Sequence, residues 1–122
     1  MSKILVVEDA AAEAAQIRNI LEQGGFSVYT VSSSEEAELR MKQQPPALII
    51  LDVILPGQSG YELCRKIKGD PTTRAIPVVL CTTKSSEVDK TWGGMSGADA
   101  YITKPIDDVE LLGAVKRLAR AY

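Results

Sequence analysis

Short aliphatic runs alternate along the chain with longer segments whose apolar residues recur at helical spacing. The runs have the length of strands, and most are rich in valine and isoleucine, which favours strands. They span residues 3–7, 26–31, 47–51, 76–81 and 100–103. The segments between them place apolar side chains three or four residues apart, as on one face of a helix. The pattern therefore predicts five strands and five helices in alternation.

The predicted helices share apolar positions at that spacing. These are Ala14, Ile17, Ile20 and Leu21 in the first helix, Ala37, Leu39 and Met41 in the second, Leu63, Cys64 and Ile67 in the third, and Val109, Leu112, Val115, Leu118 and Ala119 in the last. The fourth helix, from about residue 86, has a weaker pattern. Gly93 and Gly94 within it each cost a helix on the order of 1 kcal/mol relative to alanine, so we expect this helix to fray.

The predicted helix boundaries carry capping signals. Three pairs resemble capping boxes, in which a side chain at the start of a helix faces an acid three residues later. These pairs are Ser33 with Glu36, Ser86 with Asp89, and Asp107 with Glu110. Gly24 and Gly25 are expected to end the first helix, and Pro45 and Pro46 to end the second.

Strands that alternate with helices at this short spacing predict parallel pairing through right-handed crossovers. The result is a doubly wound α/β sheet with helices on both faces. Open sheets of this kind bind ligands at the carboxyl ends of their strands, near the point where the strand order reverses. We therefore look for function in the residues that follow each strand.

Composition narrows the functional classes. The 122 residues have the length of one domain, so we expect a single domain, 1–122, with no output domain. A net charge of −2 argues against direct binding of nucleic acid. The sequence contains no histidine, and Cys64 and Cys81 lack metal-ligand spacing, so a zinc site is not expected. No signal peptide or membrane-spanning run is apparent, so we expect a cytoplasmic protein without membrane insertion.

Polar residues follow four of the predicted strands. Glu8 and Asp9 follow the first strand and Asp52 the third. Thr82 follows the fourth strand and Lys104 the fifth. Three carboxylates at one edge would repel one another unless a cation lay between them, and oxygen ligands suit Mg²⁺.

A carboxylate beside a divalent metal and a lysine suggests phosphoryl transfer. Asp52 stands alone where the other two acids are paired, and a carboxylate can act as the nucleophile that forms an aspartyl phosphate. The metal and Lys104 would neutralise charge on the transferred group, and Thr82 would supply a hydrogen bond. These residues also have structural alternatives. Asp9 or Thr82 could cap the next helix, Asp52 could be an ordinary surface acid, and Lys104 could be a solvated loop residue.

From Ile4 to its last helix, the sequence resembles the receiver domains of bacterial response regulators, including the single-domain regulators of chemotaxis and twitching motility. The motifs that carry the resemblance are VVED, LDVILPGQSG, LCTT and YITKP, in that order. The resemblance implies a flavodoxin-like fold with strand order 2-1-3-4-5. Such domains are phosphoryl acceptors that catalyse their own phosphorylation and dephosphorylation, and they are not conventional enzymes.

The resemblance also implies roles for individual residues. Asp52 would accept a phosphoryl group from a histidine kinase or phosphotransfer protein. Asp9, Asp52 and the backbone carbonyl of Ile54 would hold Mg²⁺, or Mn²⁺ as an alternative, and Glu8 would act mainly through a metal-bound water. A downstream protein would bind the face formed by the fourth helix, fifth strand and fifth helix.

The same resemblance implies a switch. The hydroxyl of Thr82 would move toward the phosphoryl group, and the ring of Tyr101 would turn inward. Two positions depart from the commonest family pattern. Ile54 stands where polar side chains are frequent, and Lys84 stands where an acid is frequent. Both flank the path of the water that hydrolyses the phosphate, so a bulky Ile54 predicts a long-lived phosphoryl state.

Three other readings of the sequence are possible. A flavodoxin would need a Ser-, Thr- and Gly-rich loop after the first strand, where this chain has EDAAAE. A metal-dependent aspartate phosphatase would need an acid in place of Ile54. A phosphorylation-independent adaptor of receiver fold is disfavoured by the intact acids, Thr82 and Lys104.

Overall fold

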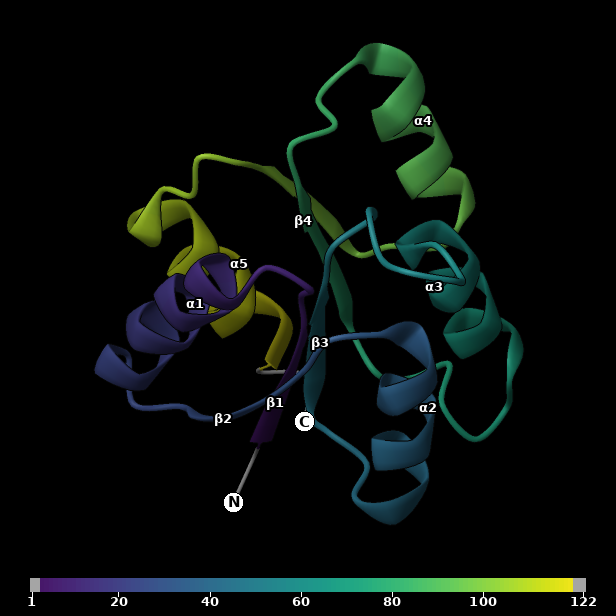
Figure 1. The fold of residues 1–122 in the computed structure, drawn as a ribbon, viewed down its shortest axis with the longest axis horizontal. Coiled ribbons are helices and arrows are strands. Elements are labelled where there is room, and N and C mark those ends of the chain that lie inside the picture. Colours follow the sequence, from purple (N-terminus) through teal and green to yellow (C-terminus); the bar gives the residue numbers. More distant parts are fainter. Residues whose placement is uncertain (1–2, 120–122) are drawn as a thin grey trace.

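A computed structural model describes residues 3–119, in which five strands alternate with five helices (Figure 1). The elements are β1 (Lys3–Val7), α1 (Ala11–Gln23), β2 (Ser27–Val31), α2 (Ser34–Gln43), β3 (Leu48–Leu51), α3 (Gly60–Gly69), β4 (Val78–Thr82), α4 (Glu87–Met95), β5 (Ala100–Thr103) and α5 (Asp108–Ala119). The predicted alternation is confirmed, and predicted and observed strands differ by at most two residues at either end. None of the helices in this part of the chain is long and apolar enough to cross a membrane.

All strands of the sheet are parallel, in the order β2-β1-β3-β4-β5. The order reverses between β1 and β3, which are direct neighbours with Val7 paired to Leu51. Helices α1 and α5 cover one face of the sheet, and α2 and α3 cover the other, with α4 at the far end of that side (Figure 1). The doubly wound arrangement and the predicted strand order are therefore confirmed.

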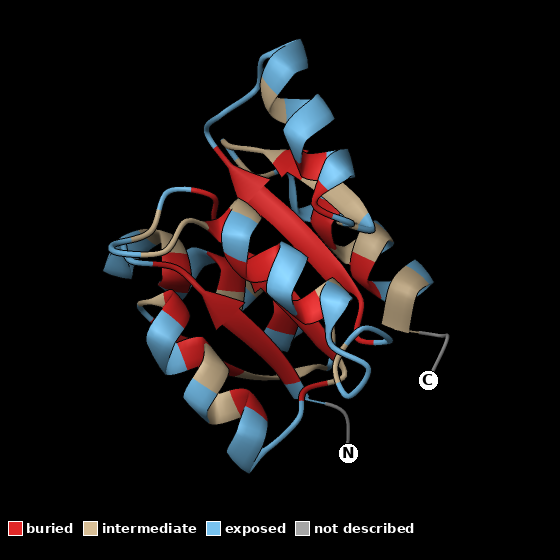
Figure 2. Cartoon of the chain, turned by 90° about the vertical axis from the view of Figure 1, so that its right-hand side faces the viewer, coloured by how far each residue is buried: buried red, intermediate tan, exposed pale blue. Residues whose placement is uncertain are grey.

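The sheet separates two hydrophobic layers, because successive strand side chains point to opposite faces. In β1, Ile4 and Val6 pack on the side of α1 and α5, whereas Leu5 and Val7 pack on the side of α2 and α3. Figure 2 shows the buried strands between helices whose outer faces are exposed. Burial on both faces explains why the strands read as continuous apolar runs.

Two residues of the predicted helical stripes are not in the core. Leu39 on α2 and Val109 on α5 are exposed. In α5 the buried positions are Leu111 and Val115, one turn apart. The spacing of α5 admits two overlapping apolar stripes, and the sheet selects the one that contains Leu111.

The predicted helix ends are confirmed in part. Ser86 and Asp89 form a reciprocal capping box at the start of α4. Ser33 accepts a hydrogen bond from the Glu36 amide, but the Glu36 carboxylate accepts from Ser32 and so does not close the box. Asp107 accepts from the Val109 amide. A box that the sequence reasoning missed, Ser59 with Glu62, starts α3.

Helix α4 runs unbroken through its two glycines. Gly93 is buried, and a Cβ atom placed there would lie 2.6 Å from Cδ2 of Tyr101. Gly94 is exposed, and nothing lies within 4 Å of the equivalent position. The absence of a side chain at Gly93 therefore allows α4 to pack closely on β5, whereas no such contact requires a glycine at position 94.

Candidate functional site

The carboxyl ends of β1, β3, β4 and β5 bring together most of the residues predicted to act. Glu8 follows β1, Asp52 follows β3 and Lys104 follows β5, while Thr82 is the last residue of β4. The backbone aligns these ends, because the Asp52 amide donates to the Val7 carbonyl (3.0 Å) and the Lys104 amide donates to the Thr82 carbonyl (2.8 Å). The site is thus built on strand ends of a rigid sheet.

Asp52 is a buried carboxylate with both oxygens engaged. The side chain is 8% exposed. Its Oδ1 accepts a hydrogen bond from the Ile54 amide (3.1 Å), and its Oδ2 lies 3.0 Å from Nζ of Lys104. A carboxylate that is removed from water and held by two donors is fixed in orientation, as an attacking group must be.

The loop after Asp52 is held close to the strand end by Gly60. Its amide donates to the Val53 carbonyl (2.9 Å). A Cβ atom on Gly60 would lie 2.1 Å from the carbonyl oxygen of Asp52, a distance that no side chain tolerates. The glycine therefore allows the start of α3 to pack directly on the backbone of Asp52.

Lys104 lies among three carboxylates. Its Nζ is 2.5 Å from Oε1 of Glu8, 2.8 Å from Oε2 of Glu13 and 3.0 Å from Oδ2 of Asp52. The side chains of Lys104 and Glu8 are only 7% and 3% exposed. With all four groups ionised, three negative charges against one positive leave the cluster at −2.

Burial and pairing shift the protonation equilibria of this cluster. Loss of solvent raises the pKa of Glu8 above its ordinary value of 4.5, and the hydrogen bond from Lys104 opposes the rise only in part. For Lys104, desolvation lowers the pKa, but hydrogen bonds to Glu13, Glu8 and Asp52 outweigh it, so the pKa is raised. The lysine is firmly protonated.

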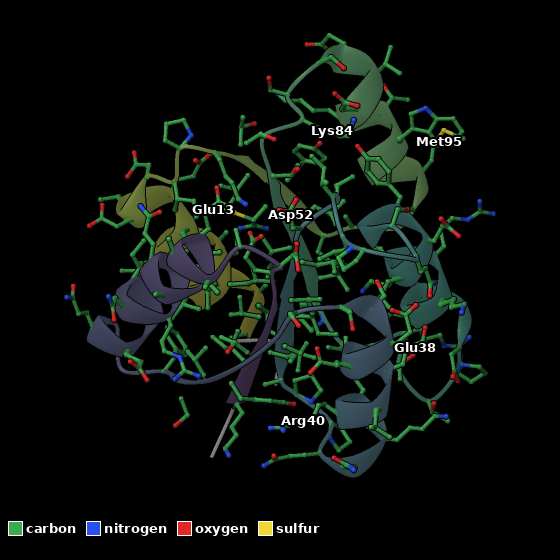
Figure 3. The ribbon with its side chains drawn as sticks, viewed as in Figure 1. Glu13, Glu38, Arg40, Asp52, Lys84 and Met95 are labelled. Atoms are coloured by element: carbon green, nitrogen blue, oxygen red, sulfur yellow. The ribbon has the colours of Figure 1, made fainter. Side chains whose placement is uncertain are left out.

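Glu13 belongs to this cluster although the sequence reasoning did not select it. It lies in the first turn of α1, and Figure 3 shows it at the same end of the sheet as Asp52. The position of Glu13 in the first turn of α1 could have indicated that it faces the site. A helix that begins at the carboxyl edge of a sheet presents its first turn to that edge, so an acid there can face the site.

Asp9 lies outside the cluster. It is exposed in the loop between β1 and α1, and the acids whose oxygens lie within 4.8 Å of one another are Glu8, Glu13 and Asp52. Asp9 does not cap α1 either, since Ala10 occupies the cap position. The Ala10 amide donates instead to Oε2 of Glu8 (3.2 Å).

The Thr82 side chain is fully buried at the end of β4. Its Oγ1 accepts a hydrogen bond from the amide of Lys84 (3.4 Å), in the loop that leads to α4. The Thr82 hydroxyl is therefore linked to the β4–α4 loop. Thr82 does not cap α4, because Ser86 occupies that position.

Tyr101 is half-buried on β5, and its hydroxyl donates to the Lys84 carbonyl (2.6 Å). The hydroxyl also lies 3.3 Å from that of Tyr61 on α3, which donates to the Asp89 carbonyl (2.8 Å) on α4. Tyr61 was not anticipated from the sequence. The two tyrosines connect α3, β5 and the segment from Lys84 to α4.

The donor set suits a hard divalent cation. Glu8, Glu13 and Asp52 each offer a carboxylate oxygen, and oxygen ligands are those that Mg²⁺ and Mn²⁺ prefer. The −2 charge of the cluster matches such an ion. Lys104 Nζ lies among the same oxygens, so a metal held by this cluster would share its ligands with the ammonium.

Fold and site together define a class of protein: a flavodoxin-like α/β domain with a buried aspartate and a lysine at the carboxyl edge of its sheet. A family model for the response regulator receiver domain matches residues 4–116. The chain therefore belongs to the response regulator receiver family. Receiver domains are phosphoryl acceptors in signalling, bind Mg²⁺ at an acidic pocket, and interact with histidine kinases or phosphotransfer proteins.

Individual relatives cover almost the whole chain. It is 41% identical to the phosphate regulon transcriptional regulatory protein PhoB of Rhizobium meliloti, over 98% of this chain but 53% of that protein. It is 35% identical to the protein PilH of Pseudomonas aeruginosa, over 94% of this chain and 95% of that protein. A solved signal receiver domain of a signal transduction histidine kinase from Syntrophus aciditrophicus superposes with a TM-score of 0.92 at 41% identity, over 99% of this chain and 92% of the other.

Proposed function

We propose that Asp52 accepts a phosphoryl group from a histidine kinase or phosphotransfer protein in a Mg²⁺-dependent reaction, and that the modified chain changes its binding to a downstream protein. The observation that carries the proposal is the buried Asp52 carboxylate, held by the Lys104 ammonium on one oxygen and the Ile54 amide on the other. A role in motility or taxis signalling, suggested by the sequence resemblance, is part of this proposal.

The proposed transfer is a displacement at phosphorus. An oxygen of Asp52 attacks, the new O–P bond forms as the N–P bond of a phosphohistidine breaks, and the imidazole nitrogen leaves with the electron pair. Lys104 stabilises negative charge on the transferred oxygens. Mg²⁺ would neutralise further negative charge on the transferred oxygens. The residues proposed to hold it are Glu8 and Asp52, together with Asp9 and the backbone carbonyl of Ile54, which the family resemblance implies as ligands.

Thr82 and Tyr101 are the residues we propose for the switch. Thr82 Oγ1 is bonded to the Lys84 amide, and Tyr101 is bonded to the Lys84 carbonyl, so both contact one residue of the β4–α4 loop. A hydroxyl that turned toward a phosphoryl group would give up its bond to this loop. The loop and α4 would then change position relative to β5, which is a shift between two populations.

The proposed downstream surface is the α4–β5–α5 face. Val88, Trp92 and Met95 on α4 are exposed apolar side chains spaced three or four residues apart. Figure 3 shows Met95 on the outer side of α4. Exposed apolar and aromatic residues on one helix are typical of protein contacts.

The test is intact mass spectrometry after incubation with Mg²⁺ and acetyl phosphate. We expect one phosphoryl adduct on the wild type, none on Asp52→Asn, and none when a chelator removes the metal. Asp108→Asn is the matched control, because Asp108 is an exposed aspartate at the start of α5, and it should be labelled like the wild type. An unlabelled wild type would support a phosphorylation-independent adaptor instead.

A further inference from the structure

Glu13 is bound to the ammonium of Lys104, and the proposed transfer gives it no role beyond the carboxylate oxygen that it offers to the acidic cluster. Its Oε2 lies 2.8 Å from Lys104 Nζ, compared with 3.0 Å for the acceptor Asp52. Its side chain is 41% exposed, whereas those of Glu8 and Asp52 are 3% and 8% exposed. The lysine is thus shared between two buried acids and one that is open to water.

The hydrogen bonds of Lys104 are fully used in this arrangement. An ammonium group has three N–H donors, and its three carboxylate partners account for all of them. When Asp52 becomes an acyl phosphate, its carboxylate charge is lost and one donor can turn to the phosphoryl group. A second donor becomes available only if Glu8 or Glu13 releases the lysine.

Of these two acids, Glu13 is the one that can release it at low cost. Glu8 is buried and can release the lysine only where another cation takes its place, because a buried carboxylate without a cation is strongly unfavourable. Glu13 can be solvated instead, because water already reaches its side chain. Its negative charge also opposes a second negative group bound to the same ammonium.

We propose that Glu13 is a positioning residue that competes with the phosphoryl group for Lys104, and so limits how strongly the site holds that group. The inference rests on the proposed function. In the unmodified chain, Glu13 holds the ammonium toward α1. In the modified chain, this contact is weakened or lost, and the affinity of the site for a phosphoryl-like anion is lower than it would be without Glu13.

The test is titration with beryllofluoride, a phosphoryl mimic, at saturating Mg²⁺, with the bound anion followed by ¹⁹F NMR. Replacement of Glu13 by glutamine keeps the shape of the side chain and removes its charge. We expect Glu13→Gln to lower the dissociation constant about fivefold, in keeping with the loss of one competing charge-assisted hydrogen bond. Glu22→Gln is the control: it makes the same charge change on an exposed position of the same helix and should leave the constant unaltered.

Tighter binding separates this role from a structural one. If Glu13 only fastened α1 to the site, its loss would weaken binding and lower the melting temperature. Equal affinity or weaker binding in Glu13→Gln would overturn the inference while leaving the proposed function intact. A wild type that shows no bound ¹⁹F signal would overturn both.

Discussion

At the residue scale, the acids of the site differ in how far their side chains are buried. Glu8 and Asp52 are buried against Lys104, and this pairing makes two adjacent carboxylates tolerable at the end of an apolar sheet. Glu13, in contrast, keeps contact with solvent. The Lys104 ammonium is therefore paired with two buried acids, which need a nearby cation, and with one acid that water can solvate.

Ile54 provides a test of phosphoryl lifetime. Its amide donates a hydrogen bond to Asp52, two residues earlier, and its side chain is exposed. We expect Ile54→Asn to shorten the half-life of the phosphoryl adduct by about threefold or more, equivalent to roughly 0.7 kcal/mol of activation free energy, because a polar side chain admits water that isoleucine obstructs.

The measurement is the decay of the adduct mass after the phosphodonor is removed. Leu39→Asn is the matched control, since it replaces an exposed aliphatic residue on α2 and should leave the half-life unchanged. An unaltered or longer half-life in Ile54→Asn would show that isoleucine does not obstruct hydrolysis.

At the element scale, the two glycines of α4 lie in different surroundings, so replacing each by alanine should change the free energy of unfolding in opposite directions. Gly93→Ala places a methyl group against the Tyr101 ring and should lower the free energy of unfolding by about 1–3 kcal/mol. Gly94→Ala meets open space and should raise it by up to about 1 kcal/mol, because alanine favours helix. Urea denaturation of both variants measures the difference. Effects of the same sign would contradict the assigned packing.

These glycines also show what the sequence could predict about elements. From the sequence alone, Gly93 and Gly94 are expected to lower the stability of the helix equally. Only the packed structure shows that Gly93 lies where α4 approaches β5. Strands were predictable to within two residues because burial on both faces leaves continuous apolar runs. The buried face of α5 was not, because Val109 and Leu111 begin overlapping stripes and only contact with the sheet chooses between them.

The candidate site was predictable where it follows from topology. Residues just past parallel strands lie at one edge of the sheet, and this rule predicted that Glu8, Asp52 and Lys104 lie together. The same rule included Asp9, which lies outside the cluster. Residues carried by helices were missed. Glu13 contacts Lys104, and Tyr61 contacts Tyr101, because of how α1 and α3 are oriented on the sheet. The sequence alone does not determine that orientation.

At the scale of the whole molecule, stability should fall on the alkaline side. Burial raises the pKa of the Cys81 thiol to about 12 and raises those of Cys64, Tyr29 and Tyr101 as well. For Lys104, hydrogen bonds raise the pKa above 10.5 despite desolvation. Each of these groups binds its proton more tightly in the folded chain.

The unfolded chain therefore loses these protons first as the pH rises, and the free energy of unfolding decreases. The contribution of Lys104 is fully present below a pH of about 10.5 and is lost as the pH rises through its higher folded value. Urea denaturation at about pH 8 and about pH 11 should show a clear decrease. Equal free energies at both values would mean that these groups titrate as they do in an unfolded chain.

The ion pair between Glu8 and Lys104 joins residues 96 positions apart. Because synthesis starts at the N-terminus, Glu8 and Asp52 are made long before Lys104. Throughout most of synthesis, therefore, the Glu8 and Asp52 carboxylates lack the lysine that they contact in the folded protein. A chain broken off before residue 104 contains Asp52 but lacks the ammonium that holds one of its carboxylate oxygens in the folded protein.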